Sequence, residues 1–207
     1  MTLKMNKYVQ LPFIMTVSGS NGEGKSHYIK YLISSFYKVW DLVVVFSNTA
    51  EFNNSYDFLS EKQNKFFIFN TIYYEEALKK IMAIQRNNIK NGNNRKILIV
   101  FDDVLGQCKD SKILKILISQ NRHFNMSVIF AVQYINLAAT YLREISYYDV
   151  LFSLKTHNSL KACYDNYFIS DYDNFTEFKK NMKLERYQFF FADRLTNTKR
   201  ILRCPAT

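Results

Sequence analysis

Residues 13–26 read FIMTVSGSNGEGKS and predict a buried strand that leads directly into a phosphate-binding loop. The first six residues are apolar and β-rich, which is typical of a strand. The next eight fit the pattern G-x-x-x-x-G-K-[ST], in which backbone N–H groups surround phosphate oxygens. Three of the five glycines in the chain lie within these eight residues. Because glycine adopts positive φ readily, the loop can wrap around an anion at the start of the following helix.

The loop supplies a set of predicted nucleotide-binding residues, and the expected ligand is ATP with Mg²⁺. These residues are Gly19, Ser20, Asn21, Gly22, Glu23, Gly24, Lys25, Ser26 and His27. Lys25 is expected to reach the β- and γ-phosphates, and the Ser26 hydroxyl is expected to be a ligand of Mg²⁺. Glu23 differs from the others because a carboxylate repels phosphate, so we expect its side chain to point into solvent.

A second motif, ILIVFDD at residues 97–103, is a hydrophobic run that ends in two carboxylates. Asp102 is placed to hold Mg²⁺ through water, and Asp103 to act as the general base that polarises the attacking water. Two consecutive acids suit a hydrolase, whereas a small-molecule kinase needs no base at this position. A further strand unit separates the loop from the acid pair, which indicates the additional-strand class of P-loop ATPases.

Apolar runs and helical periodicity alternate along the chain. Strands are predicted at residues 13–18, 42–46, 66–69, 97–101, 127–132 and 150–154, and helices at 26–40, 74–88, 110–124 and 137–145. After residue 158 we expect one or two polar helices and two strand-like runs, 187–191 and 200–202. The alternation predicts an α/β fold with a mostly parallel sheet, helices on both faces, and ligands at the carboxyl ends of the strands. We expect one domain over residues 1–207, with a core at about 11–155 and a C-terminal extension, 156–207, packed on it.

Composition favours a globular chain with an anionic partner. Hydrophobic residues make up 48% of the 207 residues, which excludes a disordered chain, and the net charge is +10. The cysteines Cys108, Cys163 and Cys204 lie far apart, which argues against a disulfide framework or a zinc site. No apolar run reaches the ~18 residues of a spanning helix, and the polar N-terminus lacks a secretory signal, so we expect a cytosolic protein.

Two groups of basic residues could contact DNA phosphates or simply form a solvated surface. The first group is Lys79, Lys80, Arg86, Lys90, Arg95 and Lys96. The second group is Lys179, Lys180, Lys183, Arg186, Arg194, Lys199, Arg200 and Arg203. Aromatic residues are interleaved in the tail, and their spacing is more typical of a core than of a base-stacking surface: Tyr164, Tyr167, Phe168, Tyr172 and Phe175.

Four segments together resemble the poxvirus-type genome-packaging ATPases of the FtsK–HerA superfamily. They are MTVSGSNGEGKSHYI, ILIVFDDV, NRHFNMSVIFAVQ and LREISYYDVLFSLK, in this order, and the resemblance covers residues 11–155. The phosphate loop is shared with many families, but the acid pair, the Arg-His pair and the glutamine after the fourth strand are more specific in combination. The resemblance implies an ATP-driven motor that moves double-stranded DNA into a viral capsid.

The resemblance also implies roles for individual residues and partners. Gln133 matches the polar sensor of the γ-phosphate, and Arg122 with His123 matches the family's Arg-His pair. Either Arg122 or Arg143 could act across a subunit interface as an arginine finger. The implied partners are double-stranded DNA, a homo-oligomeric ring (pentamer or hexamer) and capsid vertex components. The implied location is the host cytoplasm at the assembly site, or the virion.

Two alternatives stay open from the sequence. One is another FtsK–HerA-type DNA translocase or a ring helicase, which a strand-displacement assay separates from a duplex translocase. The other is a nucleotide-switched binding or assembly protein with little turnover, against which Asp103 argues. The resemblance ends near Lys155, so it assigns no role to residues 158–207.

Overall fold

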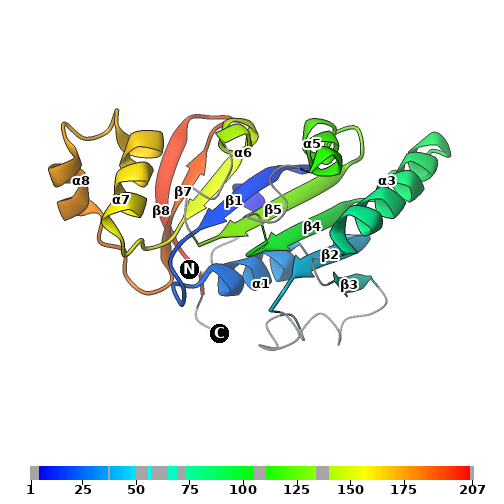
Figure 1. Cartoon of the computed structure of the whole chain (residues 1–207), viewed down its shortest axis with the longest axis horizontal. Coiled ribbons are helices and arrows are strands. Elements are labelled where there is room, and N and C mark those ends of the chain that lie inside the picture. Colours follow the sequence, from blue (N-terminus) through cyan, green and yellow to red (C-terminus); the bar gives the residue numbers. More distant parts are fainter. Residues whose placement is uncertain are drawn as a thin grey trace.

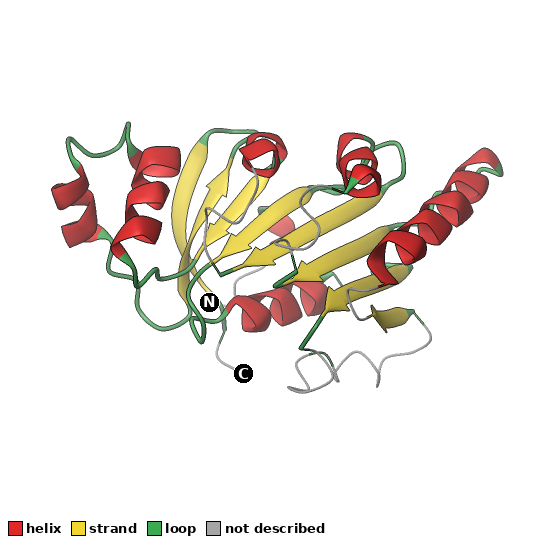
Figure 2. Cartoon of the chain, in the orientation of Figure 1, coloured by secondary structure: helices red, strands yellow, loops and turns green. Residues whose placement is uncertain are grey.

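The computed structural model describes residues 5–36, 38–49, 56, 65–69, 73–104, 111–133 and 140–205, without the side chains of residues 6, 140, 141 and 143. These residues form an eight-stranded sheet with helices on both faces (Figures 1 and 2). The strands are β1 (Ile14–Ser18), β2 (Leu42–Ser47), β3 (Phe66–Phe69), β4 (Ile97–Asp102), β5 (Met126–Val132), β6 (Tyr148–Leu151), β7 (Gln188–Asp193) and β8 (Thr198–Arg203). The helices are η1 (Met5–Lys7), α1 (Lys25–Ser35), α3 (Tyr74–Lys90), α5 (Lys112–Ser119), α6 (Thr140–Ile145), α7 (His157–Cys163), the π-helix η5 (Tyr164–Phe168) and α8 (Phe175–Asn181).

The strand order across the sheet is β3-β2-β4-β5-β1-β6-β7-β8. All neighbours from β3 to β6 in this order are parallel, and β7 and β8 continue the sheet in antiparallel fashion. β5 lies between β1, which leads into the glycine-rich loop, and β4, which ends in the acid pair. An inserted strand at this place is the additional-strand arrangement, so the predicted fold class is confirmed.

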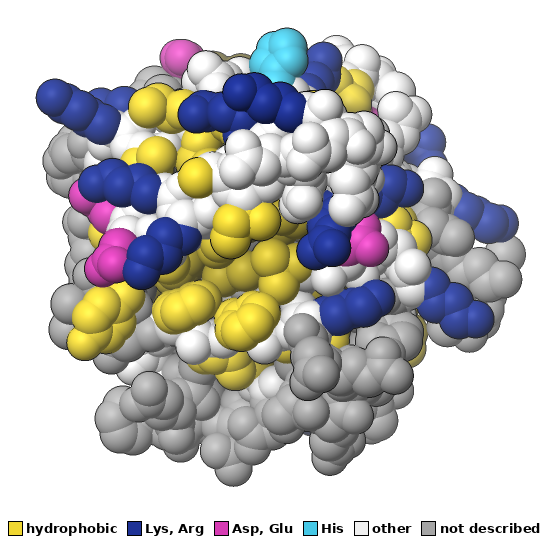
Figure 3. All heavy atoms as spheres, turned by 90° about the vertical axis from the view of Figure 1, so that its right-hand side faces the viewer, with side chains coloured by type: hydrophobic (Ala, Val, Ile, Leu, Met, Phe, Trp, Pro, Cys, Tyr) yellow, Lys and Arg dark blue, Asp and Glu magenta, His cyan; other side chains and the backbone are white. Residues whose placement is uncertain are grey.

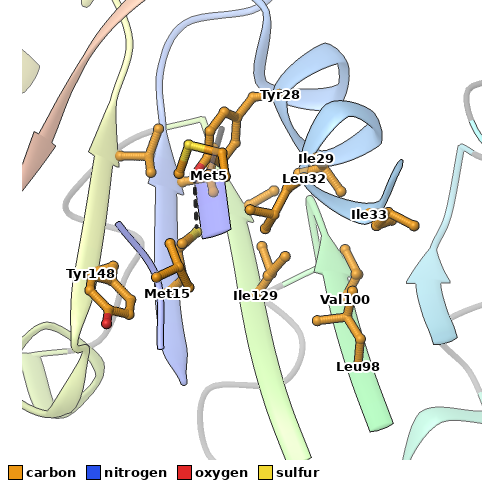
Figure 4. Packing of buried hydrophobic residues seen from close by; sticks show 14 of the residues in the cluster. Met5, Met15, Tyr28, Ile29, Leu32, Ile33, Leu98, Val100, Ile129 and Tyr148 are labelled. Carbon is orange, nitrogen blue, oxygen red and sulfur yellow. Dashed lines mark hydrogen bonds between the residues drawn. The ribbon is translucent and has the colours of Figure 1, made fainter. Parts of the chain in front are cut away.

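Each face of the sheet carries its own hydrophobic core, because successive side chains of a strand point to opposite sides. In β2, Val45 belongs to the core under α1, and its neighbour Val44 to the core under α3 and α5. Figure 4 shows the buried side chains that α1 presents to β4 and β5: Tyr28, Ile29, Leu32 and Ile33. Burying an aliphatic side chain of this size stabilises the fold by about 1.5–3 kcal/mol.

Two helices end earlier than the periodicity predicted. The helix predicted at 26–40 ends at Ser35, and a turn in which the Val39 N–H donates to the Phe36 carbonyl (2.8 Å) follows it. This turn returns Trp40 to the core, where it is 3% exposed. The apolar spacing that suggested a longer helix therefore came from a residue that packs on the same core after the helix has ended.

The helix predicted at 110–124 likewise ends at Ser119, so Arg122 and His123 lie in a turn and not in a helix. Asn125 closes this turn with φ of 50°, a conformation that an α-helix excludes, and the Met126 N–H donates to the Asn121 carbonyl at 2.9 Å. The strand predicted at 150–154 is displaced to Tyr148–Leu151, and beyond its end the Ser153 carbonyl accepts a hydrogen bond from the backbone N–H of the loop residue Ser20 (3.1 Å).

The C-terminal residues build a third core against the outer part of the sheet. α7, η5 and α8 pack on Phe190 of β7. The aromatic residues of this region are core residues, as predicted: Tyr164, Tyr167 and Phe168 are buried, and Tyr172 and Phe175 pack against them. At its far end, the β7–β8 hairpin returns to its own start, where the Cys204 N–H donates to the Tyr187 carbonyl (3.0 Å).

An ion pair with a buried carboxylate joins this hairpin to the parallel part of the sheet. The Asp149 carboxylate of β6 is completely buried, and it accepts hydrogen bonds from Arg194 Nε (2.5 Å), from Ser146 Oγ (2.9 Å) and from Thr16 Oγ1. A buried carboxylate with three donors has its charge compensated, which is the condition for tolerating burial. The hairpin is therefore fixed to β6 and, through Thr16, to β1, the strand that leads into the glycine-rich loop.

Candidate nucleotide-binding site

The glycine-rich loop lies at the carboxyl end of β1 and ends where α1 begins at Lys25. Gly24 is the N-cap of α1, with φ of 110° and no side-chain cap, and Gly22 has φ of 78°. Both values lie in the left-handed region, which glycine adopts without strain. The first N–H groups of α1 therefore face the loop and, with the helix dipole, favour an anion there.

Gly19 is required for a different reason, which is close packing. A Cβ placed on Gly19 would lie 2.6 Å from the Cβ of Phe152, the residue that follows β6. Phe152 is 1% exposed, and its N–H donates to the Ser18 carbonyl (2.8 Å), so it has no room to move. The loop can approach the chain after β6 only because residue 19 has no side chain.

We expect Gly19→Ala to cost about 1–3 kcal/mol of stability through overpacking, and to weaken nucleotide binding by displacing the loop. Thermal melts and a titration with fluorescent ADP measure both effects. Gly92→Ala is the control outside the site, because a Cβ there meets nothing within 4 Å, and its positive φ (74°), which Gly19 does not share, is what opposes alanine. A Gly19→Ala variant with the melting temperature and affinity of the wild type would contradict this role.

Lys25 lies folded over the loop and is 8% exposed. Its ammonium donates to the carbonyls of Gly19 (2.7 Å) and Ser20 (3.3 Å). Burial lowers the pKa of Lys25, and the charges of Asp103, Asp102 and Glu23 oppose this effect. The structure thus places the predicted phosphate-binding lysine within electrostatic reach of both carboxylates of the acid pair, the predicted Mg²⁺ ligand Asp102 and the predicted base Asp103.

Asp102 is the last residue of β4 and is 8% exposed. Its Oδ2 accepts a hydrogen bond from the hydroxyl of Tyr56 (2.9 Å), and that tyrosine is almost completely buried. Burial raises the pKa of Asp102, while the Tyr56 hydrogen bond and the charge of Lys25 counteract the rise. Sequence reasoning missed Tyr56, because no motif or spacing relates it to the acid pair.

Asp103 and Gln133 come together although 30 residues separate them. Asp103 follows β4, has φ of 62°, and donates its N–H to the Ala131 carbonyl of the adjacent β5 (3.1 Å). Gln133 follows β5, and its Nε2 donates to the Asp103 carboxylate. The Asp103 side chain is exposed, so a water molecule can reach it.

Glu23 does not point freely into solvent as predicted. Its carboxylate forms an ion pair with Lys155 (2.8 Å), and its side chain is 25% exposed. Lys155 also donates its backbone N–H to Ser20 Oγ (3.1 Å). The chain after β6 thus holds the loop from outside, and a lysine that the sequence analysis did not select compensates the acidic side chain.

The remaining loop residues lie along the opening of the site. Asn21 is exposed, and Ser26 is half-buried in the first turn of α1. His27 turns toward the C-terminal end of the described chain, where its Nε2 lies 2.8 Å from the Pro205 carbonyl oxygen. Its ring also packs against Tyr187, with 5.1 Å between the ring centroids.

The structure places Arg122 and His123 at the amino ends of the parallel strands, whereas the loop lies at the carboxyl ends. They precede β5, whereas Gln133 follows it, and β5 spans seven residues or about 20 Å. The Arg122 guanidinium lies 4.7 Å from the centroid of the Tyr147 ring, beside a cavity of about 790 Å³. Arg143 lies in α6, but its side chain is outside the described part of the structure.

The oxygen donors at the site fit Mg²⁺. Ser26 offers a hydroxyl and Asp102 a carboxylate, and both are hard oxygen ligands. Among the described residues there is no cluster of three or more His, Cys, Asp or Glu that could hold a metal by itself. Mg²⁺ retains water molecules and binds partly through substrate phosphates, so it needs only one or two such protein ligands.

The loop, the acid pair and the strand inserted between them define a P-loop NTPase of the additional-strand class. The chain belongs to the Poxvirus A32 protein family, whose model matches residues 1–181. This finding confirms the resemblance that the four sequence segments indicated. In the part of the chain that the structure describes, the helices are too short or too polar to cross a membrane.

Relatives in this family carry a function in their names. The DNA packaging protein OPG160 of Vaccinia virus (strain Copenhagen) is 27% identical over 134 residues, which cover 60% of this chain and 47% of that protein. The DNA packaging protein OPG160 of Monkeypox virus is also 27% identical over 134 residues, covering 60% and 42% of the two chains. The match thus spans about half the length of these relatives.

Solved structures share the fold over nearly the whole chain. The genome packaging NTPase B204 from Sulfolobus turreted icosahedral virus 2, in complex with AMP, superposes with a TM-score of 0.74 at 15% identity, covering 96% of this chain and 100% of that one. EssC (ATPases 2 and 3) from Geobacillus thermodenitrificans gives 0.63 at 13% identity, covering 93% and 39%. At these identities the likeness establishes the fold alone.

Proposed function

We propose that this chain is an ATP-hydrolysing motor that moves double-stranded DNA into a viral capsid. The observation that carries the proposal is the contact between Gln133 and the exposed Asp103 carboxylate, beside the loop that holds Lys25. A carboxylate base that is hydrogen-bonded to a polar side chain suits a site that hydrolyses ATP, which a passive nucleotide-binding module does not need. The names of the OPG160 relatives and of B204 support the packaging role.

The residues divide the work of hydrolysis among them. The loop N–H groups and Lys25 bind the β- and γ-phosphates, and Ser26 and Asp102 hold Mg²⁺, Asp102 through water. When bound, Mg²⁺ neutralises charge on the phosphate oxygens. Asp103 accepts the proton of the attacking water, and Gln133 positions that carboxylate and senses the γ-phosphate. Asp102, which accepts a hydrogen bond from the Tyr56 hydroxyl, supplies its carboxylate as the ligand.

Arg122 acts on a neighbouring subunit in this proposal. Because β5 separates Arg122 from its own loop, the guanidinium has no path to its own γ-phosphate. In the proposed pentameric or hexameric ring, the strand end that carries Arg122 in one subunit faces the loop of the next subunit. An arginine finger supplied in this way increases the rate of hydrolysis about 10³- to 10⁵-fold. Arg143 is the alternative finger.

The first basic group is the better candidate for contacts with DNA. Its six residues are exposed on α3 and in the turn that follows, where Figure 3 shows Lys and Arg side chains around a hydrophobic patch. In the second group, three residues are already paired with carboxylates: Arg194 with Asp149, Lys199 with Asp171 and Arg203 with Glu185. In the first group, Lys80 pairs with Glu76 of the same helix (2.7 Å), and both side chains of this pair are exposed. If the first basic group contacts the DNA backbone, the affinity for DNA falls steeply as the salt concentration rises.

The packaging role also implies partners and a location. The partners are capsid vertex components, and the location is the host cytoplasm or the virion.

The test is the ATPase rate per subunit, measured against protein concentration with and without duplex DNA. We expect the rate to rise with concentration, because the arginine comes from a neighbour, and to rise further with duplex DNA. Arg122→Ala should abolish the concentration dependence and leave nucleotide binding unchanged. A slow rate that is independent of both concentration and DNA would favour a nucleotide-switched assembly protein instead.

A further inference from the structure

The C-terminal hairpin brings an aromatic side chain to the phosphate loop. Tyr187 directly precedes β7, and its Cδ1 would lie 3.7 Å from a Cβ placed on Gly24, the N-cap of α1. Unlike the neighbouring Phe152 and Tyr28, which are completely buried, Tyr187 is only half-buried. Part of this residue is therefore exposed at the border of the loop, although its side chain also packs against the core.

The backbone of Tyr187 is strained, and contacts with neighbouring residues support this conformation. It has φ of 66°, a left-handed conformation that is unfavourable for a bulky side chain. The Cys204 N–H donates to its carbonyl (3.0 Å), and the His27 imidazole lies beside its ring. The Arg186 guanidinium lies 4.9 Å from its ring centroid. A strained, well-supported conformation at the edge of a site points to a functional constraint.

The position of this cluster relative to Lys25 indicates which part of a ligand it meets. Lys25 and the acid pair define the γ-phosphate end of the site. A nucleotide whose phosphates run along the loop toward α1 extends its ribose and base past Gly24 and His27. A partly exposed aromatic ring at that place offers a surface on which a nucleobase stacks, and the Arg186 guanidinium over the ring offers a second planar surface.

We infer that Tyr187 stacks on the nucleobase, and that Arg186 and His27 border the base and ribose. This inference rests on the proposed function, because it assumes a nucleotide on the loop. It assigns a role to the C-terminal residues, which the motifs do not cover: the β7–β8 hairpin completes the nucleotide site. Base–aromatic stacking predicts that removal of the ring weakens nucleotide binding about 5- to 150-fold.

The test compares two ligands that share only the phosphate chain. ATP and inorganic tripolyphosphate, each with Mg²⁺, are titrated by calorimetry into the wild type, Tyr187→Ala and Tyr187→Phe. We expect Tyr187→Ala to lose affinity for ATP and keep its affinity for tripolyphosphate, and Tyr187→Phe to bind both like the wild type. Tyr73→Ala is the matched control, because Tyr73 is 59% exposed at the start of α3.

Two results would overturn the inference. Unchanged ATP affinity in Tyr187→Ala shows that the ring does not contact the base. Equal losses for ATP and tripolyphosphate, in Tyr187→Ala but not in Tyr187→Phe, show that the ring only supports the loop. If the wild type binds neither ligand, the nucleotide site itself is wrong and the proposed function fails with it.

Discussion

Lys25→Ala is expected to reduce ATP hydrolysis about 10²- to 10³-fold and to weaken nucleotide binding. Lys25 is the buried cation of the loop, and the charges of Asp102 and Asp103 act on it. Without it, a bound γ-phosphate would face two carboxylates with no compensating charge from the loop. Hydrolysis is measured by phosphate release and affinity by titration with fluorescent ADP, at a protein concentration where the wild-type rate is saturated.

Lys38→Ala is the control, since Lys38 is exposed and follows α1, so its removal lowers net charge by the same amount. Thermal melts of both variants establish that they are folded. A folded Lys25→Ala variant that hydrolyses ATP at the wild-type rate would remove the loop from the mechanism. The acid pair would then need another explanation.

Asp103→Asn is expected to lower kcat about 10²- to 10⁴-fold and to leave nucleotide affinity nearly unchanged. The amide has the same shape and still offers an oxygen to Gln133 Nε2, but it cannot accept the proton of the attacking water. Single-turnover hydrolysis with radiolabelled ATP measures the chemical step, and equilibrium titration measures binding.

Asp102→Asn provides the matched comparison, because the neighbouring carboxylate is assigned to Mg²⁺ and not to proton transfer. For this variant we expect a raised Mg²⁺ requirement, so that part of the activity returns at high Mg²⁺. The Asp103→Asn defect should persist at every Mg²⁺ concentration. If the two variants behave alike, the separate roles of the two acids are wrong.

The sequence predicted the conformation of the loop and the strand before the acid pair, because local patterns determine both. The phosphate loop is contiguous, and Gly22 and Gly24 have the positive φ that the pattern implies, whereas Gly19 is required for close packing, which the pattern did not predict. The strand before the acid pair is a continuous apolar run, which is typical of a strand buried on both faces. These signals also predicted the parallel sheet.

Contacts between distant segments could not be predicted. The pairing of Glu23 with Lys155 depends on the path of the chain after β6, and that of Tyr56 with Asp102 on the connection after β2. The contact between Asp103 and Gln133 required the knowledge that β5 lies directly beside β4. Such contacts follow from strand order and register, which periodicity alone does not encode.

The arginines illustrate the same limit. A family motif identified Arg122, but only the direction of β5 shows that Arg122 and the loop of its own chain lie at opposite ends of the parallel strands. Likewise, Tyr187 has no motif around it, and its place beside Gly24 comes from the antiparallel addition of β7 and β8 to the sheet. The positions of Arg122 and Tyr187 relative to the loop therefore follow from the sheet topology, which no local motif encodes.

The most direct test of the central claim is displacement of a third strand from duplex DNA. A labelled oligonucleotide is annealed as a triplex on linear duplex DNA, and its release is followed after addition of protein, Mg²⁺ and ATP. We predict ATP-dependent release by the wild type, none by Lys25→Ala, and no separation of the duplex strands themselves. DNA-stimulated ATP hydrolysis without release of the third strand would contradict a motor that translocates along duplex DNA.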